Sequence, residues 1–464
     1  MELQLFDKQV YIDRRKALMQ NIGSGIILLP GNEDSSMSYK DNCYPFRQDS
    51  SFLYYFGLDV QDLVAIIDTD TGEEVIFGNE LSIDDIIWTG VLPSVREMAG
   101  MVGITKTQPY NEVTHYIHKA VTAGRKVHIL PPYRPETKIK LASWLNVSLQ
   151  DVADHVSIPL IKAVIAQRVI KTPLEVAEME KAVSISVDMQ LAVIKNTRPG
   201  IKGYELVARA NEVAIAADSR LGYPAIITPR GETLHTHYYG HTLQDGQMLL
   251  CDIGAENPMH YGGDLTRTVP VGNKFTTKQA ELYEVVLASM NHAIDMLKPG
   301  VRYLDIHLAA CQKLVEGLSQ AGIMKGDAVD AVAAGAHTMF FQCGLGHMLG
   351  MDTHDMENLG EQYVGYSDNL QKGTVFGLKS LRLGRELEAG YVLTIEPGIY
   401  IIPELIDRWQ AEKKYVDFIN YDVLNTYRDF GGIRIEDNFL ITDTGSHLLG
   451  KYLPKSLKEI EGLK

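Results

Sequence analysis

Two aspartates stand in neighbouring apolar segments of the sequence. Asp252 follows the run MLLC (248–251), and Asp264 precedes the alternating run LTRT (265–268). If the two segments form an antiparallel hairpin whose turn is centred on Pro258, the two carboxylates face each other across the ladder. Opposed like charges destabilise such a pair unless a cation lies between them. Taken alone, the pair fits a metal site, and it fits equally well two exposed acids in a different register.

Two glutamates repeat this pattern further along the chain. Glu396 follows the apolar run VLTI (392–395), and Glu436 follows GIRI (432–435). Glutamate is seldom buried without a partner. A salt bridge to Arg434 would account for one of the two glutamates, but not for four acids in four apolar segments.

Histidines add a nitrogen ligand. His347 lies between the two acidic pairs in the glycine-rich segment GLGHMLG (344–350), and His354 follows shortly after. A lone histidine of this kind is more often a core or surface residue than a ligand. An oxygen-rich set with one imidazole nevertheless favours a pair of Mn²⁺-like cations over a single tetrahedral zinc, and two adjacent cations would share carboxylates and hold a hydroxide between them. The candidate ligands are Asp252, Asp264, His347, Glu396 and Glu436.

The elements that must position these residues form an α+β domain. Thr172-Pro173-Leu174-Glu175 combines a capping box with proline at the first helical position, so we expect a long helix to begin there. The segments RPGIKGYEL (198–206) and KPGVRYLDI (298–306) each lie between two helical patterns, which indicates two related halves. Each half continues into β-rich sequence, so we expect the halves to face each other across a strongly curved sheet. The domain boundary is predicted shortly before Thr172, dividing the chain into residues 1–165 and 166–464.

The first 165 residues predict a smaller α/β domain. Apolar runs alternate with helical patterns, and the turn sequence DTDTG (68–72) between LVAIID and EEVIFG predicts a β-hairpin. We find no catalytic constellation in this region.

Composition excludes several classes of partner. The 464 residues include 59 acidic and 44 basic side chains, for a net charge of −15, which repels nucleic acid. The N-terminal segment is charged where a signal peptide would be apolar, and no stretch approaches the roughly 18 apolar residues of a membrane span. We therefore expect a cytoplasmic protein without a membrane partner. The four cysteines form no CxxC pair, so free thiols are expected.

Several of these segments together resemble a known family. DIGAE…YGGDLTRT, GLGHMLGMDTHD, LEAGYVLTIEPGIYI and GGIRIEDNFLIT are similar, in order and approximate spacing, to the pita-bread metallopeptidases, and within them to the aminopeptidase P and prolidase group. The segment YPFRQDSSFLYYFG (44–57) resembles the N-terminal domain of aminopeptidase P. The resemblance spans nearly the whole chain, and it implies a C-terminal pita-bread fold built from two pseudo-symmetric halves.

The resemblance also implies roles for the site residues. Asp252 would bind one metal, His347 and Glu396 the other, and Asp264 and Glu436 would bridge both. Glu396 would in addition shuttle a proton.

Three further residues match positions beside the metals. His235 and His354 match residues that contact the substrate or the developing oxyanion, although His237 or His241 could take the place of His235. Arg434 matches an arginine on the substrate side, where it would also neutralise carboxylates.

The implied activity is hydrolysis of the bond between an N-terminal residue and proline in the second position, by a metal-bridging hydroxide. The two metal ions would be Mn²⁺, with Co²⁺ or Zn²⁺ as alternatives, and the family resemblance implies a homo-oligomer, a dimer or a tetramer. A prolidase, which cleaves Xaa-Pro dipeptides, and a non-catalytic binding module of the same fold remain as alternatives. The chain departs from the family at Cys343, where a histidine is common, at Met348, and in the spacing of the two aspartates, which is one residue wider than usual.

Overall fold

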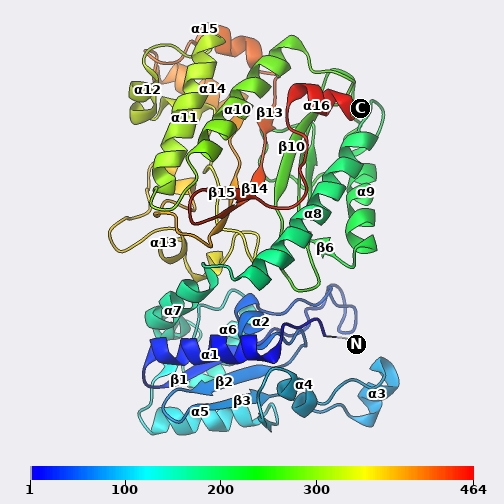
Figure 1. The fold of residues 1–464 in the computed structure, drawn as a ribbon, viewed down its shortest axis with the longest axis vertical. Helices are drawn as coiled ribbons and strands as arrows, with labels where there is room; N and C mark the ends of the chain where they lie inside the picture. Colours follow the sequence, from blue (N-terminus) through cyan, green and yellow to red (C-terminus); the bar gives the residue numbers. More distant parts are fainter. Residues whose placement is uncertain (1–2) are drawn as a thin grey trace. The chain divides into compact units, whose positions relative to one another are not determined.

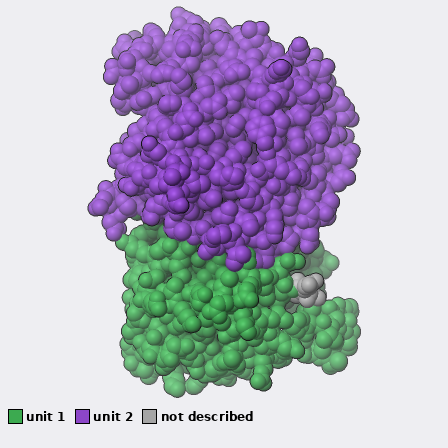
Figure 2. Space-filling view, in the orientation of Figure 1, with its two compact units in different colours: residues 1–168, 358–363 green, residues 169–357, 364–464 purple. Residues whose placement is uncertain are grey.

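The chain divides into two compact units. The computed structural model describes residues 3–464, drawn in Figure 1. One unit comprises the residues up to Arg168 together with Asn358–Tyr363, and the other comprises Val169–Glu357 and Val364–Lys464 (Figure 2). All residues expected at the metal site belong to the second unit.

A five-stranded mixed sheet organises the first unit, with the strand order β4-β3-β2-β1-β5. The turn at residues 68–72 joins β2 and β3 as an antiparallel hairpin, as the sequence predicts, because Asp68 Oδ1 accepts hydrogen bonds from the amides of Asp70 and Thr71. The strands are β1 (Ile26–Pro30), β2 (Val64–Asp68), β3 (Glu73–Phe77), β4 (Lys106–Gln108) and β5 (Val127–His128).

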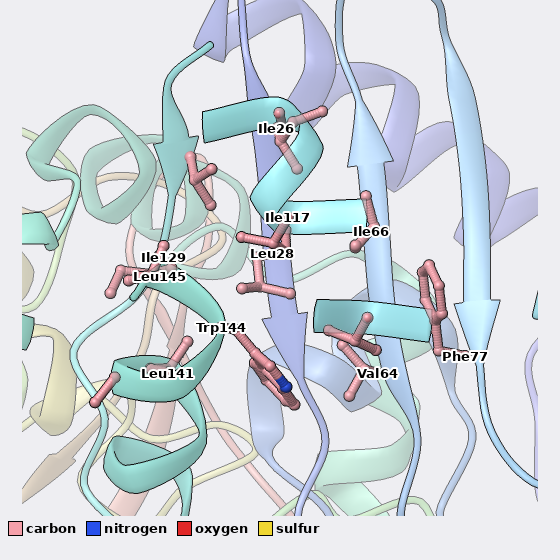
Figure 3. Packing of buried hydrophobic residues seen from close by; sticks show 14 of the residues in the cluster. Ile26, Leu28, Val64, Ile66, Phe77, Ile117, Ile129, Leu141, Trp144 and Leu145 are labelled. Carbon is pink, nitrogen blue, oxygen red and sulfur yellow. The ribbon is translucent and has the colours of Figure 1, made fainter. Parts of the chain in front are cut away.

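Apolar side chains of this sheet pack against two helices. Figure 3 shows Leu28 of the sheet between Ile117 of α5 (Glu112–Thr122) and Trp144 of α6 (Pro135–Leu145), and Ile66 belongs to the same cluster. Burial of this cluster supplies the main favourable free energy of the unit. The other helices are α1 (Lys8–Ile22), α2 (Ser50–Phe56), α3 (Ile83–Thr89), α4 (Val95–Met101), η1 (Asp151–His155) and α7 (Ile158–Arg168).

The second unit begins with the long helix expected from its cap. Helix α8 spans Pro173–Asn196, and the Thr172 hydroxyl accepts a hydrogen bond from the Glu175 amide while the Glu175 carboxylate accepts from the Thr172 amide. Two donors at the helix start are thereby satisfied, as the capping box requires. Helix α9 (Gly203–Ala216) follows, and it packs against α8.

A second helix pair repeats this arrangement. Helices α10 (Thr277–Asp295) and α11 (Tyr303–Gln320) pack against each other, as Figure 1 shows. Gly200 and Gly300 precede α9 and α11 with φ of 87° and 85°, a region that favours glycine. The Gly200 amide donates to the Leu243 carbonyl at 2.8 Å, and the Gly300 amide donates to the Leu387 carbonyl at 2.9 Å. The prediction of two related halves is therefore confirmed in the backbone hydrogen bonds.

Each helix pair is followed by antiparallel strands. In the first half β8 lies between β7 and β10, and in the second half β14 lies between β11 and β15. A bridge between Thr266 and Glu436 links the two sets. The strands are β6 (Arg220–Leu221), β7 (Ile226–Thr228), β8 (Met248–Ile253), β9 (Ala255–Glu256), β10 (Leu265–Pro270), β11 (Val392–Ile395), β12 (Gly398–Tyr400), β13 (Gly432–Arg434), β14 (Asp437–Ile441) and β15 (Ser446–Leu448). The α+β class is confirmed.

The predicted register between the two aspartate segments is wrong by two residues. Asp252 pairs with Thr266, not with Asp264. The cause is the turn: Asn257 Oδ1 accepts hydrogen bonds from the amides of Met259 and Tyr261, which centres the loop on Met259 instead of Pro258. Because side chains alternate with a period of two, this shift leaves Asp252 and Asp264 on the same face.

The remaining elements are short. They are α12 (Ala328–Ala334), η2 (Ala336–Met339), η3 (Glu357–Leu359), α13 (Glu361–Val364), η4 (Leu378–Ser380), α14 (Pro403–Ala411), α15 (Tyr421–Leu424), η5 (Asn425–Tyr427) and α16 (Leu457–Gly462). Within residues 3–464, no helix has both the length and the apolar character needed to cross a bilayer. All four cysteines are free, as expected.

Candidate metal centre

Four strand ends bring the predicted carboxylates together. Asp252 lies in β8 and Asp264 directly precedes β10, whereas Glu396 directly follows β11 and Glu436 lies between β13 and β14. Each half of the unit thus contributes two acids. The bridge between Thr266 and Glu436 closes the distance between the halves, and the Thr266 hydroxyl donates to Glu436 Oε2 at 2.7 Å.

His347 completes this group from a segment beside β11. Its amide donates to Thr394 Oγ1 at 3.1 Å, and its carbonyl accepts from the Thr394 amide at 3.0 Å. Its Nε2 lies 3.4 Å from Asp264 Oδ2 and 3.5 Å from Glu396 Oε1. One donor atom from each of Asp264, His347 and Glu436 lies within 4.8 Å of the others, close enough for one ion to contact all three.

The electrostatics of the group call for a cation. Burial raises the pKa of Asp264 to about 7, with the nearby charge of Asp252 as the next cause. Burial also raises the pKa of Glu436 well above its ordinary value, and Asp264 and Glu396 add to that shift. Glu436 Oε1 is buried and has no hydrogen-bond partner. A divalent cation relieves both the repulsion and the unpaired oxygen, so the donor set fits the expected metals.

Tyr223 connects the two aspartates, and sequence reasoning missed it. Its phenol contacts Asp252 Oδ1 at 2.6 Å and also hydrogen-bonds Asp264 Oδ1. Burial raises the pKa of Tyr223 well above its ordinary value, and the two carboxylates raise it further, so the phenol keeps its proton. Tyr223 lies between β6 and β7, far in sequence from both aspartates, and no local pattern marks it.

Arg434 supplies one positive charge next to the carboxylates. Its Nη2 donates to Asp252 Oδ2, its Nη1 donates to Tyr400 Oη at 3.1 Å, and its Nε lies 4.0 Å from Glu396 Oε2. This geometry is the one expected for an arginine that neutralises nearby carboxylates. A single positive charge cannot balance four acids, which leaves room for further positive charge.

His354 stands next to the predicted metal-binding histidine. The rings of His347 and His354 lie 4.4 Å apart between centroids, in an edge-to-face arrangement. His354 Nδ1 lies 2.5 Å from Glu357 Oε2, and Arg382 Nε donates to that same oxygen at 3.4 Å. Burial lowers the pKa of His354, and the neighbouring His347 lowers it further. His354 therefore lies beside the ligands with its Nδ1 held by a carboxylate. Glu357 and Arg382 were not among the predicted residues.

His235 lies on an irregular segment between β7 and β8. Partial burial lowers its pKa, and Arg434, Arg382, Asp252 and His354 are the charges that act on it. Those charged groups belong to the carboxylate centre, so His235 lies close enough to the centre for its charges to shift the pKa of the imidazole. Of the alternatives, the ring of His241 packs against Tyr238 with centroids 4.7 Å apart.

Cys343 occupies the position where a histidine was expected from the family pattern. Its thiol lies 3.8 Å from the Tyr400 hydroxyl, which in turn accepts from Arg434. Burial raises the pKa of Cys343 to about 12, so the side chain is a neutral thiol. It can neither carry an imidazolium charge nor act as a base at neutral pH.

Two family models match the chain. Residues 177–443 match metallopeptidase family M24, and residues 11–130 match the aminopeptidase P N-terminal domain. The first match covers more than half of the chain and contains every predicted site residue.

Curated relatives and solved structures agree with the family models. The chain is 31% identical to a human Xaa-Pro dipeptidase over 94% of this chain and 88% of the relative. It is 32% identical to a probable Xaa-Pro aminopeptidase of Sordaria macrospora over 94% of this chain and 91% of the relative. The structure of Escherichia coli aminopeptidase P with the inhibitor Pro-Leu superposes with a TM-score of 0.81 at 27% identity, covering 99% of this chain and 98% of that one. The predicted pita-bread fold with its additional N-terminal domain is confirmed.

Proposed function

The chain belongs to metallopeptidase family M24, and from this premise we propose that it is an aminopeptidase that releases the N-terminal residue from peptides with proline in the second position. The observation that supports this most directly is the convergence of Asp252, Asp264, His347, Glu396 and Glu436 at the strand ends of both halves. In this proposal these five residues hold two divalent cations. When bound, the cations supply a Lewis acid that polarises the scissile carbonyl and makes hydroxide available near neutral pH.

The remaining side chains position the substrate and the charges. The Glu357 carboxylate accepts from His354 Nδ1 and favours the doubly protonated ring, which would present its Nε2–H to the oxyanion of the tetrahedral intermediate. Glu396 is the candidate proton carrier, since burial raises its pKa. Arg434 and Tyr223 hold the Asp252 carboxylate in place through hydrogen bonds to its two oxygens.

The two metals are proposed to be Mn²⁺, because the donor set contains four carboxylates and one imidazole and lacks sulfur. Protein freed of metal with a chelator should lose Xaa-Pro hydrolysis and regain it with Mn²⁺. Elemental analysis during the titration should show two Mn²⁺ ions per chain when activity is full. Activity that survives rigorous chelation would overturn the proposal.

The relatives also favour a second candidate, an Xaa-Pro dipeptidase, because the human relative carries that name. Both activities use the same centre and differ in whether a third residue is accepted. The test is a panel of Xaa-Pro, Xaa-Pro-Yaa and Xaa-Ala-Yaa peptides. Cleavage of Xaa-Pro-Yaa supports the aminopeptidase, and cleavage of Xaa-Pro alone supports the dipeptidase. Equal cleavage of Xaa-Ala-Yaa would contradict proline specificity. We also propose a dimer or tetramer, which sedimentation equilibrium would test.

A further inference from the structure

A second group of metal-binding side chains is buried in the same unit, outside the carboxylate centre. His307 and Cys311 lie on α11, and His337 lies on the short helix η2. Their exposed fractions are 1%, 0% and 5%. One donor atom from each lies within 4.8 Å of the other two. The cluster contains no carboxylate, unlike the peptidase centre.

The geometry of the helical pair suits coordination. His307 and Cys311 are one turn apart, so their side chains share one face of α11. Cys311 Sγ lies 3.6 Å from His307 Nε2. Zinc–sulfur bonds of about 2.3 Å and zinc–nitrogen bonds of about 2.1 Å in a tetrahedron separate the two donors by about 3.6 Å. The two side chains are thus already spaced as a tetrahedral ion requires.

Unpaired nitrogen atoms distinguish this cluster from an ordinary buried hydrogen bond. A thiol donating to His307 Nε2 would account for Cys311 and for that one nitrogen. His307 Nδ1 and His337 Nδ1 are buried and have no hydrogen-bond partner. Buried polar atoms are nearly always satisfied, so an unpaired nitrogen of His337 within a cluster of three possible metal ligands needs a cause.

The protonation states agree with metal binding. Burial lowers the pKa of His307 to about 3 and that of His337 to about 4, so both rings are neutral at pH 7. Neutral imidazole is the form that binds metal ions. Cys311 is a thiol whose pKa burial raises, and a bound cation would displace its proton to solvent.

We propose that His307, Cys311 and His337 bind one divalent cation of the borderline class, with Zn²⁺ as the best fit, at a site separate from the peptidase centre. Two nitrogens and one sulfur favour Zn²⁺, whereas the oxygen-rich centre favours Mn²⁺. The bound ion joins η2 to α11. His307 also packs against Phe341, with ring centroids 5.8 Å apart, at the start of the segment that leads to His347. The site therefore has a structural role, holding that segment in place.

Cobalt absorption spectra test the site without any measurement of activity. Chelated protein titrated with Co²⁺ should develop a thiolate-to-cobalt charge-transfer band in the near ultraviolet, which four carboxylates and one imidazole, the proposed ligands of the peptidase centre, do not produce. The band should disappear in Cys311→Ser and persist in the matched control Cys43→Ser, whose cysteine lies in the other unit. Absence of the band from the unmodified protein, or its persistence in Cys311→Ser, would overturn the proposal.

Thermal unfolding provides a second test, which separates this site from the peptidase centre. In an Asp264→Asn background, which weakens the carboxylate centre, Zn²⁺ should still raise Tm, because a ligand that binds only the folded state stabilises it. Adding His337→Asn should remove that rise while circular dichroism confirms a folded protein. An equal rise in both backgrounds contradicts the proposal. If the unmodified protein shows the cobalt band but does not hydrolyse Xaa-Pro peptides, the proposed function fails while this site stands.

Discussion

The hydroxyl of Thr266 donates a 2.7 Å hydrogen bond to Glu436 Oε2, which leaves Oε1 of the same carboxylate buried and unpaired. One oxygen is thus held by the protein, and the other remains available to a cation. A hydrogen bond of this kind suits a bridging metal ligand, because a carboxylate that is already oriented loses less entropy when it binds the metal ion. Thr266 is two residues from Asp264 on the same side of the chain, so one short segment contributes both a ligand candidate and the residue that orients another.

Replacing the Thr266 hydroxyl should weaken metal binding without removing a ligand. Thr266→Val keeps the shape and deletes the donor to Glu436, so we expect metal affinity to fall by about 10- to 100-fold, as is typical when a partner of a metal ligand is lost. Titration of the chelated variant with Mn²⁺, followed by activity, measures the change. Thr266→Ser, which retains the hydroxyl, is the matched control. Equal affinity in Thr266→Val and the unmodified protein would refute the orienting role.

Removal of the Asp264 carboxylate should abolish hydrolysis of Xaa-Pro peptides and lower metal content. Asp264 lies 3.4 Å from His347 Nε2 and is one of the two predicted bridging ligands, so its loss affects both ions. Elemental analysis of Asp264→Ala, paired with a peptide assay, tests this. The exposed Asp443 offers the control Asp443→Asn, which should retain metal and turnover. Full metal occupancy with normal turnover in Asp264→Ala would rule out the assigned site.

His354 should matter for turnover more than for metal content. Its ring lies beside His347 but its Nδ1 is taken by Glu357, so we expect it to act on the oxyanion. Deleting one oxyanion donor lowers kcat by about 100- to 1,000-fold in other hydrolases. Steady-state kinetics of His354→Ala with parallel metal analysis measures both quantities. Loss of metal from the variant would show that His354 is instead a ligand.

The two histidines of the second cluster should make metal-free protein less stable in mild acid. Burial lowers the pKa of His307 to about 3 and that of His337 to about 4, whereas both titrate near 6.5 when unfolded. The two neutral rings contribute fully to the free energy of unfolding above about pH 6.5. This contribution is lost as the pH falls towards the folded-state pKa values, because the unfolded state binds protons that the folded state does not.

Each proton taken up on unfolding changes the free energy of unfolding by about 1.4 kcal/mol per pH unit, so the two together should give about twice that slope. Urea unfolding of chelated protein between pH 6 and pH 4.5 measures it. His307→Gln removes one titrating group, and its slope should be smaller by about one proton. An unchanged slope would mean that His307 is not buried as a neutral ring.

Local sequence was enough to place the main helices and to name the candidate ligands. The cap at Thr172 and Glu175 predicted where α8 begins, because capping depends on side chains three residues apart. The two proline–glycine segments predicted the repeated helix pairs, since a positive φ at Gly200 and Gly300 is a local property. The family resemblance, carried by short motifs around each ligand, is confirmed by the match to metallopeptidase family M24.

Only the tertiary structure decided which distant segments come into contact. The register of β8 and β10 depended on the side chain of Asn257 in the turn, which shifted the predicted pairing by two residues. Tyr223 reaches both aspartates, and His337 reaches the cluster on α11, through chain folding that no local pattern encodes. Periodicity and capping arise from interactions within a few residues, whereas burial, unpaired atoms and shifted pKa values arise only when remote segments share a low-dielectric interior. Sequence therefore determined which residues could bind metal, and folding determined which side chains support them and brought together the cluster proposed as a second site.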